Sequence, residues 1–215
     1  SATDHDMQLR ADPSTVRIVP WAVDPTAQVI HDCFDRQGRL VPYAPRSVLR
    51  RVCELYAAKG WQPVVAPELE FYLIDQANVN GRPQPPMSPL SGKRPQSTQV
   101  YMIDDLDEYA DCLQDILEGA QEQGIPADAV VKESAPAQFE INLHHVADPL
   151  KACDYALLLK RLVKNIAYDH EMDTTFMAKP YPNQAGNGLH VHISILDKDG
   201  RNIFTSEDPA TNDAL

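Results

Sequence analysis

Three separate stretches of this chain alternate between polar and apolar residues, and this alternation constrains the fold more than any other feature. Residues 187–195 read NGLHVHISI. Side chains of an extended strand point alternately to opposite faces, so two histidines and a serine share one face here. The two sets are His190, His192 and Ser194 against Leu189, Val191, Ile193 and Ile195. The aliphatic set predicts a face that packs in the core.

The same alternation recurs in PELEFYLI and QFEINLHH, with acidic residues on the polar face. Glu68 and Glu70 share one face of the first strand, and Glu140 lies on the polar face of the second. Glu133, in the stretch KESA, ends the strand before it. If these strands are neighbours in one sheet, four carboxylates and at least one imidazole meet on one concave surface.

Carboxylates gathered in a partly buried place are costly, because they lose water and repel one another. A divalent cation removes that cost, and oxygen ligands with an occasional imidazole suit Mg²⁺ or Mn²⁺ better than zinc. So many acids predict two or three ions, which commonly bridge the oxygens of a phosphoryl group in transfer. The alternative is that each polar pair marks only the wet face of an antiparallel sheet. Recurrence over three strands, each with an apolar opposite face, keeps the metal site as a hypothesis of equal standing beside this alternative.

Helix and strand signals alternate irregularly along the chain, without a βαβ pattern or internal repeats, which predicts an α+β fold with a largely antiparallel sheet. The predicted strands are residues 15–21, 27–34, 61–75, 128–135, 137–145, 174–179 and 187–195. The predicted helices are residues 45–60, 104–124 and 149–171, the last with Leu157, Leu158, Leu162 and Ile166 facing inward. Residues 76–99 and 180–188 are predicted loops, and DKDG predicts a hairpin into RNIF.

The composition limits the class of protein. With 43% hydrophobic and 23% charged residues, the chain can bury a sizeable core. Its net charge of -12 argues against nucleic acid as a partner, although an acidic protein can hold ATP through divalent metal. Four scattered cysteines without a C-x-x-C pair favour a reduced, cytoplasmic protein. No signal peptide or long apolar run is visible, so neither secretion nor a membrane span is expected. The final SEDPATNDAL reads as the middle of a loop, which predicts that more protein follows.

The stretches PELEFYL, KESAPAQFEIN and NGLHVHISI, in this order, resemble the metal and nucleotide motifs of the glutamine synthetase family. DMQLRADPSTVRIVPW and PRSVLRR resemble the family's segment just before them. The resemblance implies a glutamine synthetase-like fold with a curved sheet and flanking helices. In that fold, residues 1–44 are the end of an N-terminal β-grasp domain, and residues 45–215 are the first half of the catalytic domain.

The resemblance also implies a role for each residue that matches a family motif. Metal ligands are expected at Glu70, Glu133 and Glu140 for one ion, and at Glu68 and His190 for a second ion that bridges the ATP phosphates. Nucleotide contacts are expected at Asp128, His192 and Ser194. Gly186 falls in the loop whose backbone contacts the glutamate substrate. No catalytic residue beyond the metal ligands is assigned, since the amine pocket and the clamping arginines belong to segments outside the chain.

The family's reaction uses ATP to join the γ-carboxylate of glutamate to an amine through a γ-glutamyl phosphate, in homo-oligomeric, dodecamer-like double rings. This chain departs from the pattern, because Ala185 stands where ammonia-using members typically have Asn, and PELEF replaces PEPEF. His145 also replaces a common aromatic. The change at Ala185 favours the γ-glutamylpolyamine synthetase branch, which uses a polyamine or another small amine. A metal-dependent amide hydrolase and an inactive structural or binding fragment remain alternatives, and the chain alone is expected to be inactive.

Overall fold

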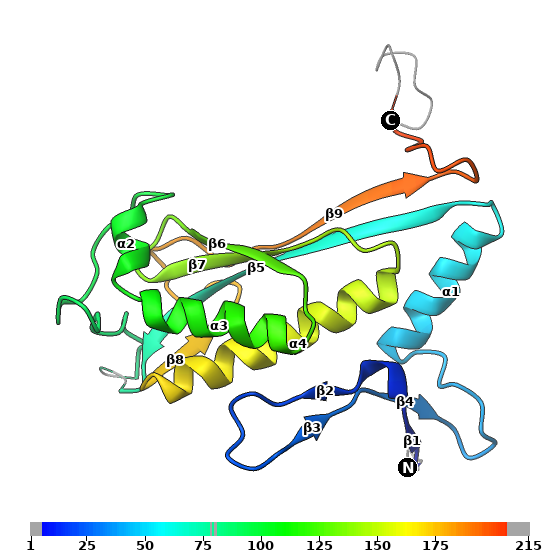
Figure 1. Cartoon of the computed structure of the whole chain (residues 1–215), viewed down its shortest axis with the longest axis horizontal. Helices are drawn as coiled ribbons and strands as arrows, with labels where there is room; N and C mark the ends of the chain where they lie inside the picture. Colours follow the sequence, from blue (N-terminus) through cyan, green and yellow to red (C-terminus); the bar gives the residue numbers. More distant parts are fainter. Residues whose placement is uncertain (1–5, 78, 80, 206–215) are drawn as a thin grey trace.

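The computed structural model describes residues 6–77, 79 and 81–205. Its strands are β1 (Gln8–Ala11), β2 (Arg17–Ile18), β3 (Ala27–Gln28), β4 (His31–Phe34), β5 (Gln62–Asp75), β6 (Ala127–Lys132), β7 (Gln138–Leu143), β8 (Met172–Thr175) and β9 (Leu189–Leu196). Its helices are α1 (Pro45–Ala57), α2 (Ile103–Asp107), α3 (Ala110–Glu122) and α4 (Pro149–Asp169), with a 3-10 turn at Pro13–Thr15. Strands β5 to β9 form one sheet over a layer made by α3 and α4, and two small sheets, β1–β4 and β2–β3, lie beyond it (Figure 1).

Strand β5 is the centre of the main sheet, and every ladder it forms is antiparallel. Glu68 of β5 is paired both with Asn142 of β7 and with His190 of β9, so β7 and β9 lie on opposite edges of β5. Tyr72 is paired with residues of β7 and β8, which places β8 on the same edge as β9. Strands β8 and β9 therefore follow one another along one edge, and residues 176–188 leave the sheet between them.

The core lies between the sheet and the two helices beneath it. Alternate residues of β5 and β7 point into it and meet apolar residues of α3 and α4, because one face of each element is continuous and apolar. The buried residues at this contact include Leu69, Phe71, Leu73, Phe139, Ile141, Leu143, Ile116, Leu158 and Leu162. The predicted apolar faces of β5 and β7 are thus confirmed, and their other faces are left free for the polar residues.

Two of the predicted helices begin and end as their end signals indicate. Helix α1 has Pro45 in its first turn, where a missing N–H costs nothing, and Gly60 follows it with φ 70°. At α4 the side chain of Asp148 accepts a hydrogen bond from the N–H of Lys151 at 3.2 Å and so caps the helix.

The predicted single helix at residues 104–124 is wrong, because the chain forms two helices, α2 and α3. Tyr109 interrupts them with φ -129° and ψ 22°. Its ring is 2% exposed and packs edge-on against Phe139, and its hydroxyl donates to the carbonyl of Pro86 at 3.0 Å. Burial of this aromatic ring explains why the chain turns inward there instead of continuing one straight helix.

Two predictions about buried residues are also wrong. Leu157 is 58% exposed, since the inward stripe of α4 runs through Leu158 and Leu162 and a helix buries only one stripe. On β9, three of the four aliphatic residues expected in the core are exposed: Leu189 by 67%, Val191 by 50% and Ile193 by 55%. Within the described residues, β9 forms a ladder with β5 alone, and α3 and α4 lie under the middle of the sheet instead.

Other predicted elements differ in length. The strands predicted at residues 15–21 and 27–34 shorten to β2, β3 and β4, and the strand predicted at 174–179 is β8, which ends at Thr175. The DKDG turn forms, with Gly200 at φ 76°, but RNIF contributes only the single bridge Leu196↔Asn202. Residues 206–215, predicted as a loop, lie outside the described residues.

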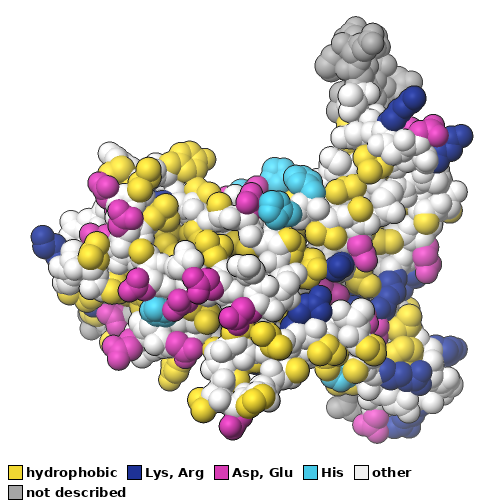
Figure 2. Space-filling view, in the orientation of Figure 1, with side chains coloured by type: hydrophobic (Ala, Val, Ile, Leu, Met, Phe, Trp, Pro, Cys, Tyr) yellow, Lys and Arg dark blue, Asp and Glu magenta, His cyan; other side chains and the backbone are white. Residues whose placement is uncertain are grey.

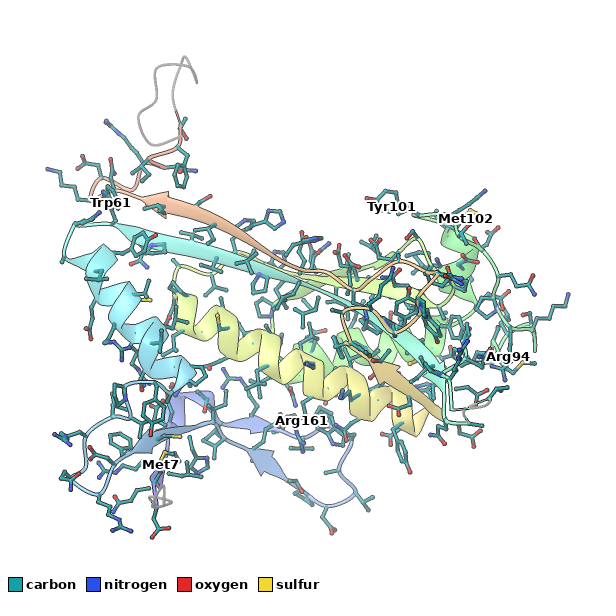
Figure 3. All side chains as sticks on the ribbon, turned by 180° about the vertical axis from the view of Figure 1, so that it is seen from behind. Met7, Trp61, Arg94, Tyr101, Met102 and Arg161 are labelled. Carbon is teal, nitrogen blue, oxygen red and sulfur yellow. The ribbon has the colours of Figure 1, made fainter. Side chains whose placement is uncertain are left out.

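The small sheets contact α4 through polar and aromatic groups. Arg161 donates from Nε to the side-chain oxygen of Gln28 at 2.8 Å, and its guanidinium lies over the ring of Trp21. Figure 3 shows Arg161 on α4 beside these strands. In the part of the chain that is described, no helix is long and apolar enough to cross a membrane.

Candidate active site

The register of the main sheet brings the predicted acidic and histidine side chains onto one face. Glu68 lies opposite His190, Glu70 opposite Glu140, and Ala66 opposite His192. This face is the one turned away from the helices, since the intervening residues of β5 and β7 form the core. Figure 2 shows a group of histidine side chains on this side of the sheet, next to acidic side chains.

Three of these side chains are close enough to share one ion. Single ligand atoms of Glu68, Glu140 and His190 all lie within 4.8 Å of one another. Nδ1 of His190 is 3.4 Å from Oε2 of Glu68 and 3.9 Å from Oε2 of Glu140. Oε1 of Glu68 lies 2.8 Å from Nε2 of His192, so Glu68 stands between the two imidazoles. A carboxylate pair with one imidazole is a donor set that suits Mg²⁺ or Mn²⁺.

The acidic side chains of this face also raise one another's pKa values. Burial raises the pKa of Glu140, and the nearby carboxylates of Glu68, Glu133 and Glu70 raise it further, while His190 lowers it. Burial likewise raises the pKa of Glu133, with Glu70 adding to the increase. Five predicted ligands therefore form one interacting cluster, in which four carboxylates outnumber one imidazole. Such a cluster is suited to hold cations.

Residues 176–188, between β8 and β9, cover the Glu70 end of this face. The backbone N–H of Glu70 donates to the carbonyl of Gly188 at 3.2 Å. A Cβ on Gly188 would stand 2.7 Å from Oε1 of Glu70 and 2.9 Å from the ring of His190. At Gly186 a Cβ would stand 2.6 Å from the carbonyl oxygen of Ala178. Both positions need glycine because the loop passes against the carboxylate and against its own backbone.

Three residues that hold this loop were missed in the sequence. Gln138 contacts the loop and Glu70 through its side-chain amide. The hydroxyl of Tyr72 donates to the carbonyl of Ala185 at 2.7 Å. The amide of Asn187 donates to the carbonyls of Thr175 and Met177 at 3.1 and 3.0 Å. Tyr72 and Gln138 have the same strand parity as Glu70 and Glu140, and this parity could have identified them.

The residues predicted to contact the nucleotide are spread over a larger part of the sheet than the predicted metal ligands. His192 is in contact with Glu68, and Ser194 lies two residues further along the same face, opposite Val64. Asp128 is exposed on β6, the outermost strand of the sheet, and its carboxylate lies 3.6 Å from His144. The rings of His145 and His192 are 6.5 Å apart, which places the unusual His145 beside the site.

The strand order, the covering helices and the cluster of acids define a class of protein. A family model described as the glutamine synthetase catalytic domain matches residues 42–214, and the chain belongs to the glutamine synthetase family. It spans less than half the length of the relatives described next.

Within this family, the chain is similar in sequence to several characterised ligases and in structure to solved family members. The chain is 47% identical over 191 residues to gamma-glutamylputrescine synthetase PuuA of Escherichia coli (strain K12), covering 87% of this chain and 40% of that protein. It is 32% identical over 203 residues to glutamate–isopropylamine ligase of Pseudomonas sp., covering 94% and 43%. A solved structure of GmaS with ADP is 28% identical with a TM-score of 0.83, covering 97% of this chain and 46% of that one. The predicted glutamine synthetase-like α+β fold is thus confirmed.

Proposed function

We propose that the protein containing this chain is an ATP-dependent ligase, which joins the γ-carboxylate of glutamate to an amine through a γ-glutamyl phosphate. One observation carries the proposal: Glu68, Glu140 and His190 converge from three adjacent strands of a chain in this family. The reaction brings two anions together, glutamate and the phosphates of ATP, so it needs a site that holds cations and aligns the reactants.

The residues of this chain fit Mg²⁺ or Mn²⁺, in two or three ions. Glu70, Glu133 and Glu140 would hold the ion beside the substrate carboxylate, and Glu68 and His190 the ion beside the ATP phosphates. Glu140 would lie between the two ions, since its carboxylate is also 3.9 Å from His190. When bound, these ions supply positive charge that offsets the charge of the transferring phosphoryl group. The raised pKa values of Glu133 and Glu140 support this assignment, because crowded carboxylates gain most from a cation.

The remaining predicted contacts place the substrates on either side of the ions. His192 and Ser194 would face the nucleotide along β9, with Asp128 at the outer strand as a further nucleotide neighbour. The backbone around Gly186 would contact glutamate. The position of this loop over Glu70 supports the assignment, since glutamate bound there would have its γ-carboxylate next to the metal ligands.

The amine is proposed to be a polyamine or another small amine in preference to ammonia. The 47% identity to gamma-glutamylputrescine synthetase supports this choice, as does Ala185 in place of an asparagine. In the complete protein we expect ADP formation only with metal, glutamate and amine together. Putrescine should exceed ammonia about tenfold or more in kcat/KM, since contacts with even one methylene are worth about that much, with spermidine and ethanolamine as comparisons. Absence of phosphate release with every amine would overturn the ligase, and amide cleavage without ATP would favour the hydrolase.

The wider assembly is part of the same proposal. Residues 1–44 are assigned to the end of a β-grasp domain and residues 45–215 to the first half of the catalytic domain. The separation of the small sheets from the main sheet supports this division. The complete protein is proposed to form a dodecamer-like double ring in the cytoplasm, and the four free cysteines fit a reducing compartment.

Replacing Gly188 with alanine should weaken metal binding without unfolding the protein. The new Cβ meets the ends of two flexible side chains, Glu70 and His190, at 2.7 and 2.9 Å, so these would swing aside while the backbone stays in place. We expect Mn²⁺ affinity to fall about tenfold, the loss typical when ligands are disoriented. Calorimetric titration with Mn²⁺ measures this. Gly81→Ala is the control for Mn²⁺ affinity, since its methyl group would meet open space, and the strain from φ 73° at Gly81 stays local to that turn. Unchanged Mn²⁺ affinity in Gly188→Ala would contradict the placement of the ions.

A further inference from the structure

Gln138 is placed between the metal-facing sheet and the covering loop. It is fully buried at the start of β7, directly opposite Tyr72 of β5. The residue before it, Ala137, is also buried and has φ 55°, a conformation that L side chains other than Asn and Asp rarely adopt. The side-chain oxygen of Gln138 accepts a hydrogen bond from the N–H of Ala135 at 3.2 Å. This bond fixes which end of the amide faces the site, and that end is the nitrogen.

The amide nitrogen of Gln138 lies near three acceptor oxygens from different segments. It is 3.1 Å from Oε2 of Glu70, 2.9 Å from the carbonyl oxygen of Gly186 and 3.1 Å from Oδ1 of Asn187. An amide nitrogen has only two hydrogens, so the three oxygens share them. Without this donor, a carboxylate, a carbonyl and an amide oxygen would face one another in a partly buried space, which is costly.

We propose that Gln138 is a positioning residue that couples glutamate binding to metal binding. This inference rests on the proposed function, in which Glu70 is a metal ligand and the loop around Gly186 contacts glutamate. The one amide contacts both groups, so a loop ordered by glutamate can orient the Glu70 carboxylate through Gln138. Ordering of the loop by glutamate therefore preorganises Glu70 for the ion, and occupation by the ion favours the loop position that accepts glutamate.

Tyr72 offers a matched control for this coupling. Its hydroxyl holds the same loop through the carbonyl of Ala185 at 2.7 Å, and its ring packs on Tyr181 with centroids 5.1 Å apart. The described hydrogen bonds of Tyr72 do not include one to Glu70. Burial, with smaller contributions from Tyr181 and Glu70, raises the pKa of Tyr72, so its hydroxyl is neutral at neutral pH and its removal leaves the charge beside Glu70 unchanged. Tyr72→Phe therefore loosens the loop at Ala185 while Gln138 still holds Glu70, whereas Gln138→Met, which is close in size and shape, loosens both the loop and the carboxylate.

The test is a titration of the complete protein with Mn²⁺, followed by electron paramagnetic resonance, with and without saturating glutamate. In Gln138→Met we expect Mn²⁺ affinity to fall about tenfold or more, as for other groups that orient metal ligands. The tightening of Mn²⁺ binding by glutamate should also disappear. In Tyr72→Phe, glutamate should bind more weakly while Mn²⁺ affinity without glutamate stays within about twofold of wild type. Thermal unfolding in EDTA checks that both variants fold.

Two results would overturn the inference: wild-type Mn²⁺ affinity and coupling in Gln138→Met, or equal losses of both affinities in the two variants. If Gln138→Met does not fold, Gln138→Asn serves instead, because its side chain is one methylene shorter and cannot both accept from Ala135 and reach Glu70. Coupling should vanish there too, and its persistence would contradict the role. ADP formation by wild type is measured in parallel, so failure of the ligase reaction is seen separately from failure of the coupling.

Discussion

Glu140→Gln is expected to reduce ADP formation on the order of a thousandfold, because metal stabilisation of charge in phosphoryl transfer is worth several kcal/mol. Glu140 lies at the centre of the cluster, where its carboxylate faces His190 and interacts with Glu68, Glu133 and Glu70. Its amide replacement keeps the shape but loses the charge that the ion needs. Steady-state assays of the complete protein with Mn²⁺, glutamate and amine measure the loss.

The same substitution should stabilise the protein when metal is absent. The folded-state pKa of Glu140 is raised by burial and by its neighbours, so the ionised form is disfavoured in the folded state. Its contribution to stability is complete below the unfolded-state pKa and is lost as the pH rises through the higher folded-state value. At neutral pH in EDTA, Glu140→Gln should therefore unfold at a higher temperature than wild type. With Mn²⁺ the order should reverse, since wild type binds the ion more tightly and gains more stability from it.

This reversal separates a metal site from an ordinary wet face of a sheet. Glu122→Gln, the same chemical change at the exposed end of α3, is the control and should alter neither the activity nor the response to Mn²⁺. If Glu140→Gln lowers stability equally with EDTA and with Mn²⁺, the acids do not form a cation site.

The alternation in the sequence was sufficient to predict which side chains share a face. It assigned Glu68, Glu70 and Glu140 correctly because parity along a strand is a local property. It could not predict the register, which sets Glu68 opposite His190 and which follows from the whole sheet. Gln138 was missed although it shares the parity of Glu140, because a neutral amide carries no charge signal, and its contact with the loop is set by the folded chain.

Burial depends on neighbours that a strand's own sequence does not reveal. Phe71 and Ile141 alternate as Val191 and Ile193 do, yet the first pair is buried and the second exposed. The difference is the position of the strand, since β5 and β7 lie over α3 and α4 while β9 lies along the edge (Figure 1). The break at Tyr109 has a similar origin, because burial of an aromatic ring against Phe139 is a tertiary effect that overrides helix periodicity.

Arg46→Met is expected to cause the largest loss of stability, about 3 kcal/mol, because it leaves three carboxylates without their shared cation. The Arg46 guanidinium binds Asp154 of α4 through two hydrogen bonds of 3.1 and 2.9 Å. It also donates to Asp32 of β4 at 2.6 Å and to Asp12, just after β1, at 2.8 Å. One side chain of α1 thus joins a small sheet to the helical layer, and the groups are only 10–21% exposed.

The stability of the protein should depend on pH through the carboxylates that bind Arg46. Hydrogen bonds from Ser14 and Arg46 lower the pKa of Asp12 from 3.8 to about 2, and Arg50 and Arg46 lower that of Asp32 despite burial. Asp154 is the exception, because burial raises its pKa more than Arg46 lowers it. A lowered folded-state pKa gives stability that is complete above the unfolded-state value and is lost as the pH falls through the folded-state value. Wild type should therefore lose stability between pH 3.8 and about 2.

Urea unfolding at neutral and acid pH tests both effects. In Arg46→Met the neutral-pH midpoint should fall, and the further loss on acidification should be smaller, because only Arg50, 2.7 Å from Asp32 and 3.9 Å from Asp12, is then left to pair with these two carboxylates. Arg36→Met is the matched control, since its pair with Asp6 is 62% and 92% exposed and such surface pairs contribute at most about 1 kcal/mol. Equal effects of the two substitutions would show that apolar contacts hold the small sheet against the helical layer. The ion pairs of Arg46 would then add no stability to that contact.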